Sequence, residues 1–240
     1  MHHVLVEQWS RGRSWLHRRD ARAKLASLAV VLIAIGTIRI GAHVALAAYF
    51  ALLLAATVAA RLPVTSILLR AGTVLPFSGT FAVVSWLSGD PQRAIALVEK
   101  SYLSALAALI LISTTPLPKL FAGLESLGVP RLINLVVQFL YRYLFVISEQ
   151  AQHMRLASRC RGGGHGGFRA ANQNRFQAAA GALAVLFARS YGRAEGVHRA
   201  MLARGFAGHF PLLAPARLSL ADGGFFLSAL AAAVLVRFVL

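Results

Sequence analysis

Cysteine and acidic residues are scarce in this chain of 240 residues. Its single cysteine, Cys160, cannot form a disulfide within the chain, which excludes a disulfide-stabilised fold. Eight positions are Asp or Glu, and Asp90, Glu99 and Asp222 are too scattered for a carboxylate metal site. Because membrane-embedded transferases gather acids or histidines at membrane depth, this scarcity disfavours that class of enzyme.

Positive charge and apolar residues are both abundant. Lys and Arg total 25, the formal net charge is +17, and 58% of the residues are hydrophobic, with a mean hydropathy of +0.65. Such hydropathy excludes a soluble nucleic-acid-binding protein and a disordered basic tail. The combination is typical of a polytopic membrane protein whose positive charge lies mainly on one side of the lipid bilayer.

Long apolar runs predict the membrane-spanning helices. Residues 1–24 are rich in arginine and precede the first run, which favours a cytoplasmic N-terminus. We expect the first helix to begin before Leu25, with Arg22 and Lys24 reaching the lipid headgroups. We also expect Pro76 to kink the third helix. The apolar runs are 25–38, 41–60, 64–87, 102–114 and 225–240.

Residues 115–210 hold twelve Lys and Arg residues. Four preceding spans return this segment to the cytoplasm, as the positive-inside rule requires. In an alternative topology, 132–147 and 177–190 both cross the membrane. Two additional crossings leave the chain ending on the same side of the membrane. The predicted organisation is a cytoplasmic basic N-terminus at 1–24, transmembrane helices 1 to 4 at 25–115, cytoplasmic helices at 116–210 and a C-terminal transmembrane helix at 211–240.

The cytoplasmic segment predicts three helices. A short amphipathic helix at 119–127 ends at a glycine, and long helices are expected from about 131 to 161 and from about 170 to 204. Each long helix ends in Arg followed by Gly. A glycine cap with a cation near the negative helix end is the structural explanation. The functional explanation is two equivalent struts that dock into a partner, because arginine binds carboxylates and carbonyls through several directed bonds.

These features resemble the transmembrane T component of energy-coupling factor (ECF) transporters, the group that includes EcfT and the cobalt/nickel protein CbiQ. The signature of that family is an Ala-Arg-Gly-like motif at the end of each of two coupling helices. The second motif is intact as Ala203-Arg204-Gly205, and the first corresponds to Cys160-Arg161-Gly162. The alternative register, Ser158-Arg159-Cys160, lacks the glycine. Thr114-Thr115-Pro116 and Leu127-Gly128-Val129-Pro130 are similar to further family segments.

The resemblance implies an all-α fold with about five transmembrane helices and a cytoplasmic three-helix coupling domain, in the inner membrane of a prokaryote. It implies a non-catalytic permease subunit for cobalt uptake, with nickel as the alternative metal. Two ABC ATPase subunits would bind ATP and Mg, and would couple through Arg161 and Arg204. A separate membrane subunit (the S subunit) would bind Co²⁺ or Ni²⁺, and a small accessory membrane subunit is a further candidate partner. The chain itself would hold no cofactor or metal.

The first long helix also predicts an interface. Its apolar residues Leu135, Phe139 and Phe145 are the expected platform for the S subunit. A self-contained channel or secondary transporter is the alternative function. That alternative would want polar residues along an intramembrane path, or internal repeats, and residues 25–114 show neither.

Overall fold

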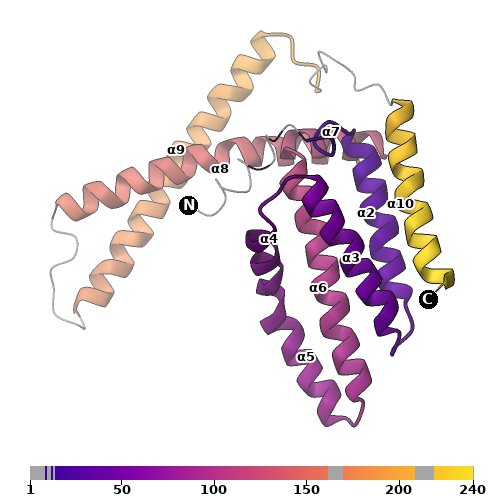
Figure 1. Ribbon diagram of the computed structural model, residues 1–240. Coiled ribbons are helices and arrows are strands. Elements are labelled where there is room, and N and C mark those ends of the chain that lie inside the picture. The colour runs from indigo at the N-terminus through magenta and orange to yellow at the C-terminus, as the bar shows by residue number, and fades with distance from the viewer. Residues whose placement is uncertain (1–8, 10–11, 13, 162–169, 209–218, 240) are drawn as a thin grey trace. The chain divides into compact units, whose positions relative to one another are not determined.

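The computed structural model describes residues 9, 12, 14–161, 170–208 and 219–239 (Figure 1). Within those ranges every regular element is a helix, so the predicted all-α class is confirmed. The chain divides into two compact units. The first contains Met1–Gly128 and Ala214–Leu240, and the second contains Val129–Leu213.

The first unit is a helical bundle in which α2, α3, α6 and α10 lie side by side (Figure 1). Tyr49 at its centre is fully buried, and the Tyr49 hydroxyl donates a hydrogen bond to the carbonyl of Ala233 at 2.8 Å, which joins α3 to α10. The helices of this unit are α2 (Ala21–Thr37), α3 (His43–Ala59), α4 (Val64–Ala71), η1 (Gly72–Val74), α5 (Leu75–Leu87), α6 (Pro91–Thr114), α7 (Leu117–Ser126) and α10 (Leu220–Val239).

The predicted kink in the third apolar run is a break in the helix. A short 3₁₀ segment, η1, separates α4 from α5, and Pro76 lies in the first turn of α5. Proline is tolerated there because the first N–H groups of a helix have no intrahelical acceptor. The run 64–87 therefore consists of two helical pieces joined by a tighter turn.

The start of α2 differs from the expectation for Lys24. The helix begins at Ala21, where Asp20 accepts a hydrogen bond from the N–H of Arg22 at 2.9 Å and so caps the helix. Lys24 is buried rather than directed to the headgroups, and its Nζ donates to the Thr114 carbonyl at 3.1 Å and to the Thr115 hydroxyl at 3.0 Å. The carbonyl at the end of α6 lacks an intrahelical donor, so the ammonium group satisfies it.

By length and composition, three helical segments could cross a membrane: Val64–Leu87, Pro91–Thr114 and Leu132–Cys160. Two shorter apolar helices, His43–Ala59 and Leu220–Val236, accompany them. These segments agree with the predicted polytopic membrane fold. Because Leu132–Cys160 is among them, the cytoplasmic position of this helix, rather than one across the membrane, stays a prediction.

The second unit consists of α8 (Arg131–Cys160) and α9 (Ala170–Ala203), which cross and contact one another (Figure 1). Both helices were predicted from their flanking Pro and Gly residues. The short helix α7, predicted as part of the same cytoplasmic segment, packs on α2 in the first unit. A Cβ at Gly123 of α7 would come within 3.2 Å of the Ala21 Cβ, so the two helices approach closely.

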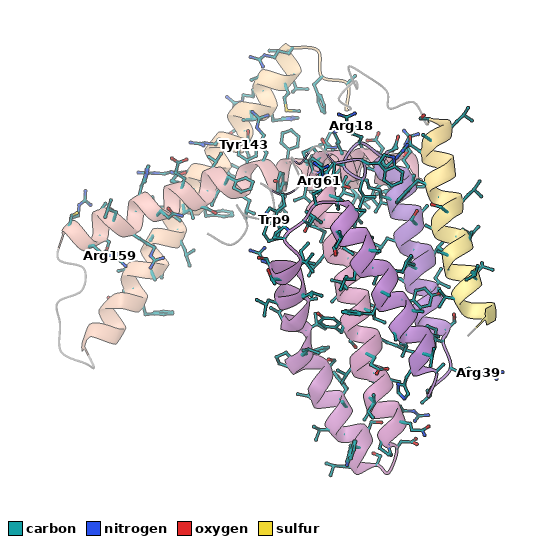
Figure 2. The ribbon with its side chains drawn as sticks, viewed as in Figure 1. Trp9, Arg18, Arg39, Arg61, Tyr143 and Arg159 are labelled. Atoms are coloured by element: carbon teal, nitrogen blue, oxygen red, sulfur yellow. The ribbon has the colours of Figure 1, made fainter. Side chains whose placement is uncertain are left out.

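Positive charge is unequally divided between the two ends of the first unit. Arg18 and Arg61 lie at one end and Arg39 lies at the opposite end (Figure 2). The end that holds Arg18 also carries Arg19, Arg22, Lys24 and Lys119. At the opposite end Arg93 and Lys100 accompany the acids Asp90 and Glu99.

Candidate functional site

The C-terminus of α9 is closed by backbone groups. Gly205 has φ +76°, a left-handed conformation that favours glycine. The N–H of Gly205 donates to the Leu202 carbonyl at 2.9 Å, and the N–H of Phe206 donates to the Met201 carbonyl at 3.0 Å. This pair of bonds is the Schellman arrangement, so the cap of α9 requires the glycine and no side chain.

The Arg204 side chain is exposed and is not used in that cap. It makes no hydrogen bond or ion pair with other residues that the structure describes. Its neighbour Arg199 behaves differently, because it forms an ion pair with Glu195 one turn earlier on the same helix. The glycine cap of the structural explanation is present, whereas among the described residues the Arg204 guanidinium makes no hydrogen bond to the last carbonyls of α9.

The end of α8 has the same exposed arginine. Arg161 follows the last helical residue with φ −88° and ψ 16°, and its N–H donates to the Ala157 carbonyl at 3.1 Å. Cys160 is a free, exposed thiol, and the Arg161 side chain is exposed too. Gly162, the third residue of the predicted motif, lies outside the described residues. The described parts of the two motifs therefore share a helix end, an exposed arginine and a small preceding residue.

The two motifs lie on different arms of the second unit. Because α8 and α9 cross, their C-terminal ends lie well apart (Figure 1). Each end adds to a basic surface, since Arg155 and Arg159 on α8 and Arg189 and Arg193 on α9 are also exposed. Figure 2 shows Arg159 near the end of its helix. Such ends suit acidic side chains or backbone carbonyls of a partner.

The predicted platform on α8 is only partly exposed. Leu135 and Phe139 are half-buried, and Phe139 stacks on Tyr143 with ring centroids 6.2 Å apart. Phe145 is 41% exposed, and its ring packs edge-on against Tyr141 at 5.2 Å. These rings therefore form pairs within α8.

A more exposed apolar row on α8 was not predicted. Leu132, Val136, Leu140 and Leu144 recur at every fourth position, and each is more than half exposed. The signal that could have found them is this spacing, which places residues on adjacent turns of one face. The sequence did not single them out, because α8 carries apolar residues on more than one face. We call these four residues the α8 row.

The helix α9 carries a comparable stripe of exposed large apolar side chains: Phe176, Leu183, Phe187 and Tyr191. Metal ligands do not accompany these surfaces, since no three His, Cys, Asp or Glu residues gather as a metal site in the described ranges. The N-terminal Met1-His2-His3 lies outside those ranges. The second unit therefore presents two kinds of surface: the exposed arginines at its helix ends, Arg161 and Arg204, which we call the arginine tips, and exposed apolar helix faces.

The chain is similar to cobalt transport proteins. A family model described as Cobalt transport protein (CbiQ) matches residues 12–212. The Cobalt transport protein CbiQ of Rhodobacter capsulatus is 28% identical over 123 residues, which are 51% of this chain and 48% of that relative. That match spans about half the length of the relative. The family match covers both arginine motifs.

Proposed function

We propose, from the premise that this chain belongs to the CbiQ family of cobalt transport proteins, that it is the coupling subunit of an ATP-driven cobalt transporter of the ECF type. In this proposal the chain catalyses no reaction. Two ABC ATPase subunits bind ATP and Mg, and a separate membrane S subunit binds the metal. Cobalt is the expected cargo, and nickel is the alternative.

The observation that carries the proposal is the state of Arg204. Its helix is capped by Gly205 and backbone bonds, while its guanidinium is exposed and bonds no described residue. An arginine fork held at a rigid helix end can make several directed bonds to a carboxylate or to carbonyl groups. Arg161 repeats the feature on the second arm, which supports docking to two equivalent ATPase surfaces.

The charge distribution supports a cytoplasmic N-terminus. The end of the first unit that holds Arg18 and Arg61 is the more basic end, and the positive-inside rule assigns it to the cytoplasm (Figure 2). The opposite end, with Arg39 and the paired His43 and Glu99, then faces outward. In this orientation the N-terminus lies on the side where ATP is available to the partner ATPases.

The exposed apolar faces of the second unit support a second contact, with the S subunit. The α8 row adds Leu140 and Leu144 to the predicted platform of Leu135, Phe139 and Phe145. Exposed apolar side chains in an unbroken row favour protein or membrane contacts. We expect Leu140→Gln to weaken association with the S subunit more than Leu135→Gln, because Leu140 is the more exposed of the two.

The decisive experiment is affinity co-purification of the full chain from its native membrane. The wild-type chain should bring down two ATPases and a second membrane protein. The variants Arg161→Ala and Arg204→Ala should each weaken ATPase retention, and the double variant should lose the ATPases. Arg142→Ala and Arg199→Ala are the matched controls, because each removes an exposed arginine from the same helix outside both motifs and outside the basic residues named at the helix ends.

Two outcomes would contradict the proposal. If the double variant retains its ATPases as well as the controls do, the arginine tips are not the docking points. If the wild-type chain comes down alone and transports Co²⁺ when reconstituted by itself, the alternative of a self-contained channel or secondary transporter is correct. Arg204→Lys separates charge from geometry, because lysine keeps the charge but loses the planar fork.

A further inference from the structure

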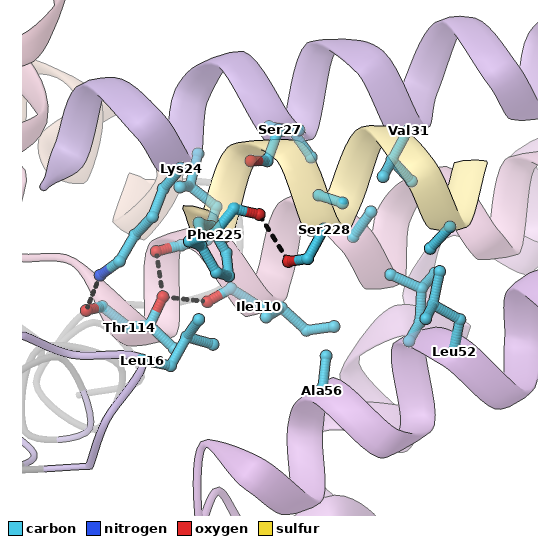
Figure 3. Close-up of a pocket in the computed structure, with 16 residues that line it drawn as sticks. Leu16, Lys24, Ser27, Val31, Leu52, Ala56, Ile110, Thr114, Phe225 and Ser228 are labelled. Atoms are coloured by element: carbon cyan, nitrogen blue, oxygen red, sulfur yellow. Dashed lines mark hydrogen bonds between the residues drawn. The ribbon is translucent and has the colours of Figure 1, made fainter. Parts of the chain in front are cut away.

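A cavity of about 330 Å³ lies inside the first unit, between α2, α3, α6 and α10 (Figure 3). Its volume falls within the range of ligand-binding pockets, roughly 300–1,000 Å³. Large apolar residues from all four helices form part of the wall: Val31, Leu52, Ile110 and Phe225. The space remains because other residues that face it are small: Ala56, Ala107, Ser228, Ala229 and Ala232.

The hydroxyl groups at the cavity do not make it polar. Ser27, Thr114 and Ser228 each donate a hydrogen bond to a carbonyl of their own helix, at distances of 2.7 to 2.8 Å. Their hydrogens are therefore not available to hold water. Apolar cavities exclude water and bind apolar molecules. Left empty, a cavity of this size would cost its lining residues their dispersion contacts. The cavity is built for an apolar occupant.

One end of the cavity carries positive charge. Lys24 lines it, and its Nζ donates one N–H to the Thr114 carbonyl (Figure 3) and a second to the Thr115 hydroxyl. The exposed Lys119 acts on Lys24 through a repulsive Coulomb interaction, so two ammonium groups share this end. Asp20 and Asp222 act on Lys24 with the opposite sign, and Asp222 also lies 3.8 Å from Arg19. Of the two lysines, Lys119 is therefore the exposed cation at this end.

We propose that the cavity holds an acyl chain of an anionic phospholipid, whose headgroup lies at the exposed Lys119, beside the end of the cavity that the buried Lys24 lines. Ser228 lines the cavity and is exposed on α10, so the cavity opens to the surface of the unit. In a membrane protein the medium at such an apolar surface consists of acyl chains. A transmembrane helix of another protein would be about 10 Å across and would not fit into this volume. The exposed ammonium group of Lys119 selects a negative headgroup by charge complementarity.

The experiment is native mass spectrometry of the purified full chain, incubated in mild detergent with equal amounts of phosphatidylglycerol and phosphatidylcholine. The wild type should retain phosphatidylglycerol in preference to phosphatidylcholine. Ala229→Trp fills the cavity and should reduce retention by about fivefold or more. The matched control is Leu227→Trp, which adds the same side chain to the exposed side of α10 and should leave retention unchanged.

A second pair of variants tests the headgroup. Lys119→Gln should reduce the preference for phosphatidylglycerol, and Arg39→Gln, at the opposite end of the unit, should not (Figure 2). Equal retention of the two lipids by the wild type, or unchanged retention in Ala229→Trp, would overturn the proposal. If Ala229→Trp does not yield folded protein, Ser228→Leu decides, because it fills less of the same space. Detergent adducts that added phosphatidylglycerol cannot displace would also overturn it.

Discussion

The carboxylate of Asp222 accepts a hydrogen bond from the backbone N–H of Asp20 at 3.2 Å, although the two residues are 202 positions apart in the chain. The same carboxylate accepts the N–H of Ser219 at 3.1 Å and lies 3.8 Å from the Arg19 guanidinium. Arg19 in turn lies over the Trp15 ring, 4.3 Å from its centroid. The last helix, α10, is thereby fastened to the start of α2, the first helix of the bundle.

Asp222→Ala should destabilise the protein strongly. The change leaves the Asp20 N–H without its acceptor and the largely buried Arg19 without its counter-charge, at a cost of about 3 kcal/mol. We expect a lower midpoint of thermal unfolding, measured in detergent by intrinsic fluorescence. The unfolding midpoint of Asp222→Asn should lie between those of Asp222→Ala and the wild type, since the amide oxygen of asparagine still accepts one hydrogen bond. An Asp222→Ala protein as stable as the wild type would show that the carboxylate does not secure α10.

The close approach of α7 to α2 predicts a steric effect at Gly123. A Cβ there would lie 3.2 Å from the Ala21 Cβ and 3.3 Å from the Leu25 Cδ1, so the larger side chain of Gly123→Leu must push α7 away. Overpacking of this kind costs about 2 kcal/mol. Gly79→Leu is the matched control, because a Cβ at that helical glycine meets nothing within 4 Å. The midpoint of thermal unfolding should therefore be lower for Gly123→Leu than for Gly79→Leu. Equal midpoints would contradict the close packing of α7 on α2.

Local signals predicted most of the helix limits. Pro130 begins α8, Gly205 ends α9, and Pro76 marks the break before α5, because proline and glycine act on the backbone where they stand. The two arginine tips could be predicted for the same reason, since a motif at a helix end is local. The sequence could not show, however, that the cap of α9 forms without the Arg204 side chain, because that depends on the hydrogen bonds of the folded chain.

Contacts between distant segments could not be predicted. From the sequence, Lys24 is expected to reach the lipid headgroups. In the fold it instead donates hydrogen bonds to Thr114 and Thr115, which lie 90 and 91 positions away in the chain. The tie between Asp20 and Asp222 has no pattern in the sequence at all. On α8 the difficulty is different, because apolar residues surround much of the helix. Only the exposed fractions separate Leu140 from the half-buried Leu135.

The left-handed cap of α9 predicts that a change at Gly205 weakens coupling even though Arg204 is kept. Gly205→Ala must adopt φ +76°, which costs a residue with a side chain about 1 kcal/mol or more. We expect the last turn to fray and Arg204 to lose its fixed position, so ATPase retention in co-purification should fall while the chain stays folded. Gly208→Ala is the control, since Gly208 has a similar φ of +82° but lies beyond the motif. Equal retention in both variants would show that the cap does not position Arg204.

Two glycines inside α9 predict that this helix bends more readily than an alanine-rich one. Gly192 and Gly196 lie within a continuous helix, and a Cβ at either position would meet nothing within 4 Å. Packing therefore does not require glycine, yet each glycine costs the helix about 1 kcal/mol relative to alanine. Such a cost is consistent with a helix that flexes near its C-terminal end, as the proposed coupling to ATPase subunits would require.

The double change Gly192→Ala and Gly196→Ala should raise the unfolding temperature and lower the amount of metal transported per ATP hydrolysed. Gly181→Ala is the matched control, because Gly181 is in the same helix and its Cβ would also meet nothing within 4 Å. It should stabilise α9 by a similar increment, about 1 kcal/mol, without changing that ratio. If the double variant is stabilised but its ratio of transport to hydrolysis equals that of the wild type, bending at these glycines has no part in coupling. If Gly181→Ala lowers the ratio equally, stiffness of the whole helix, rather than a hinge near its end, is the property that coupling depends on.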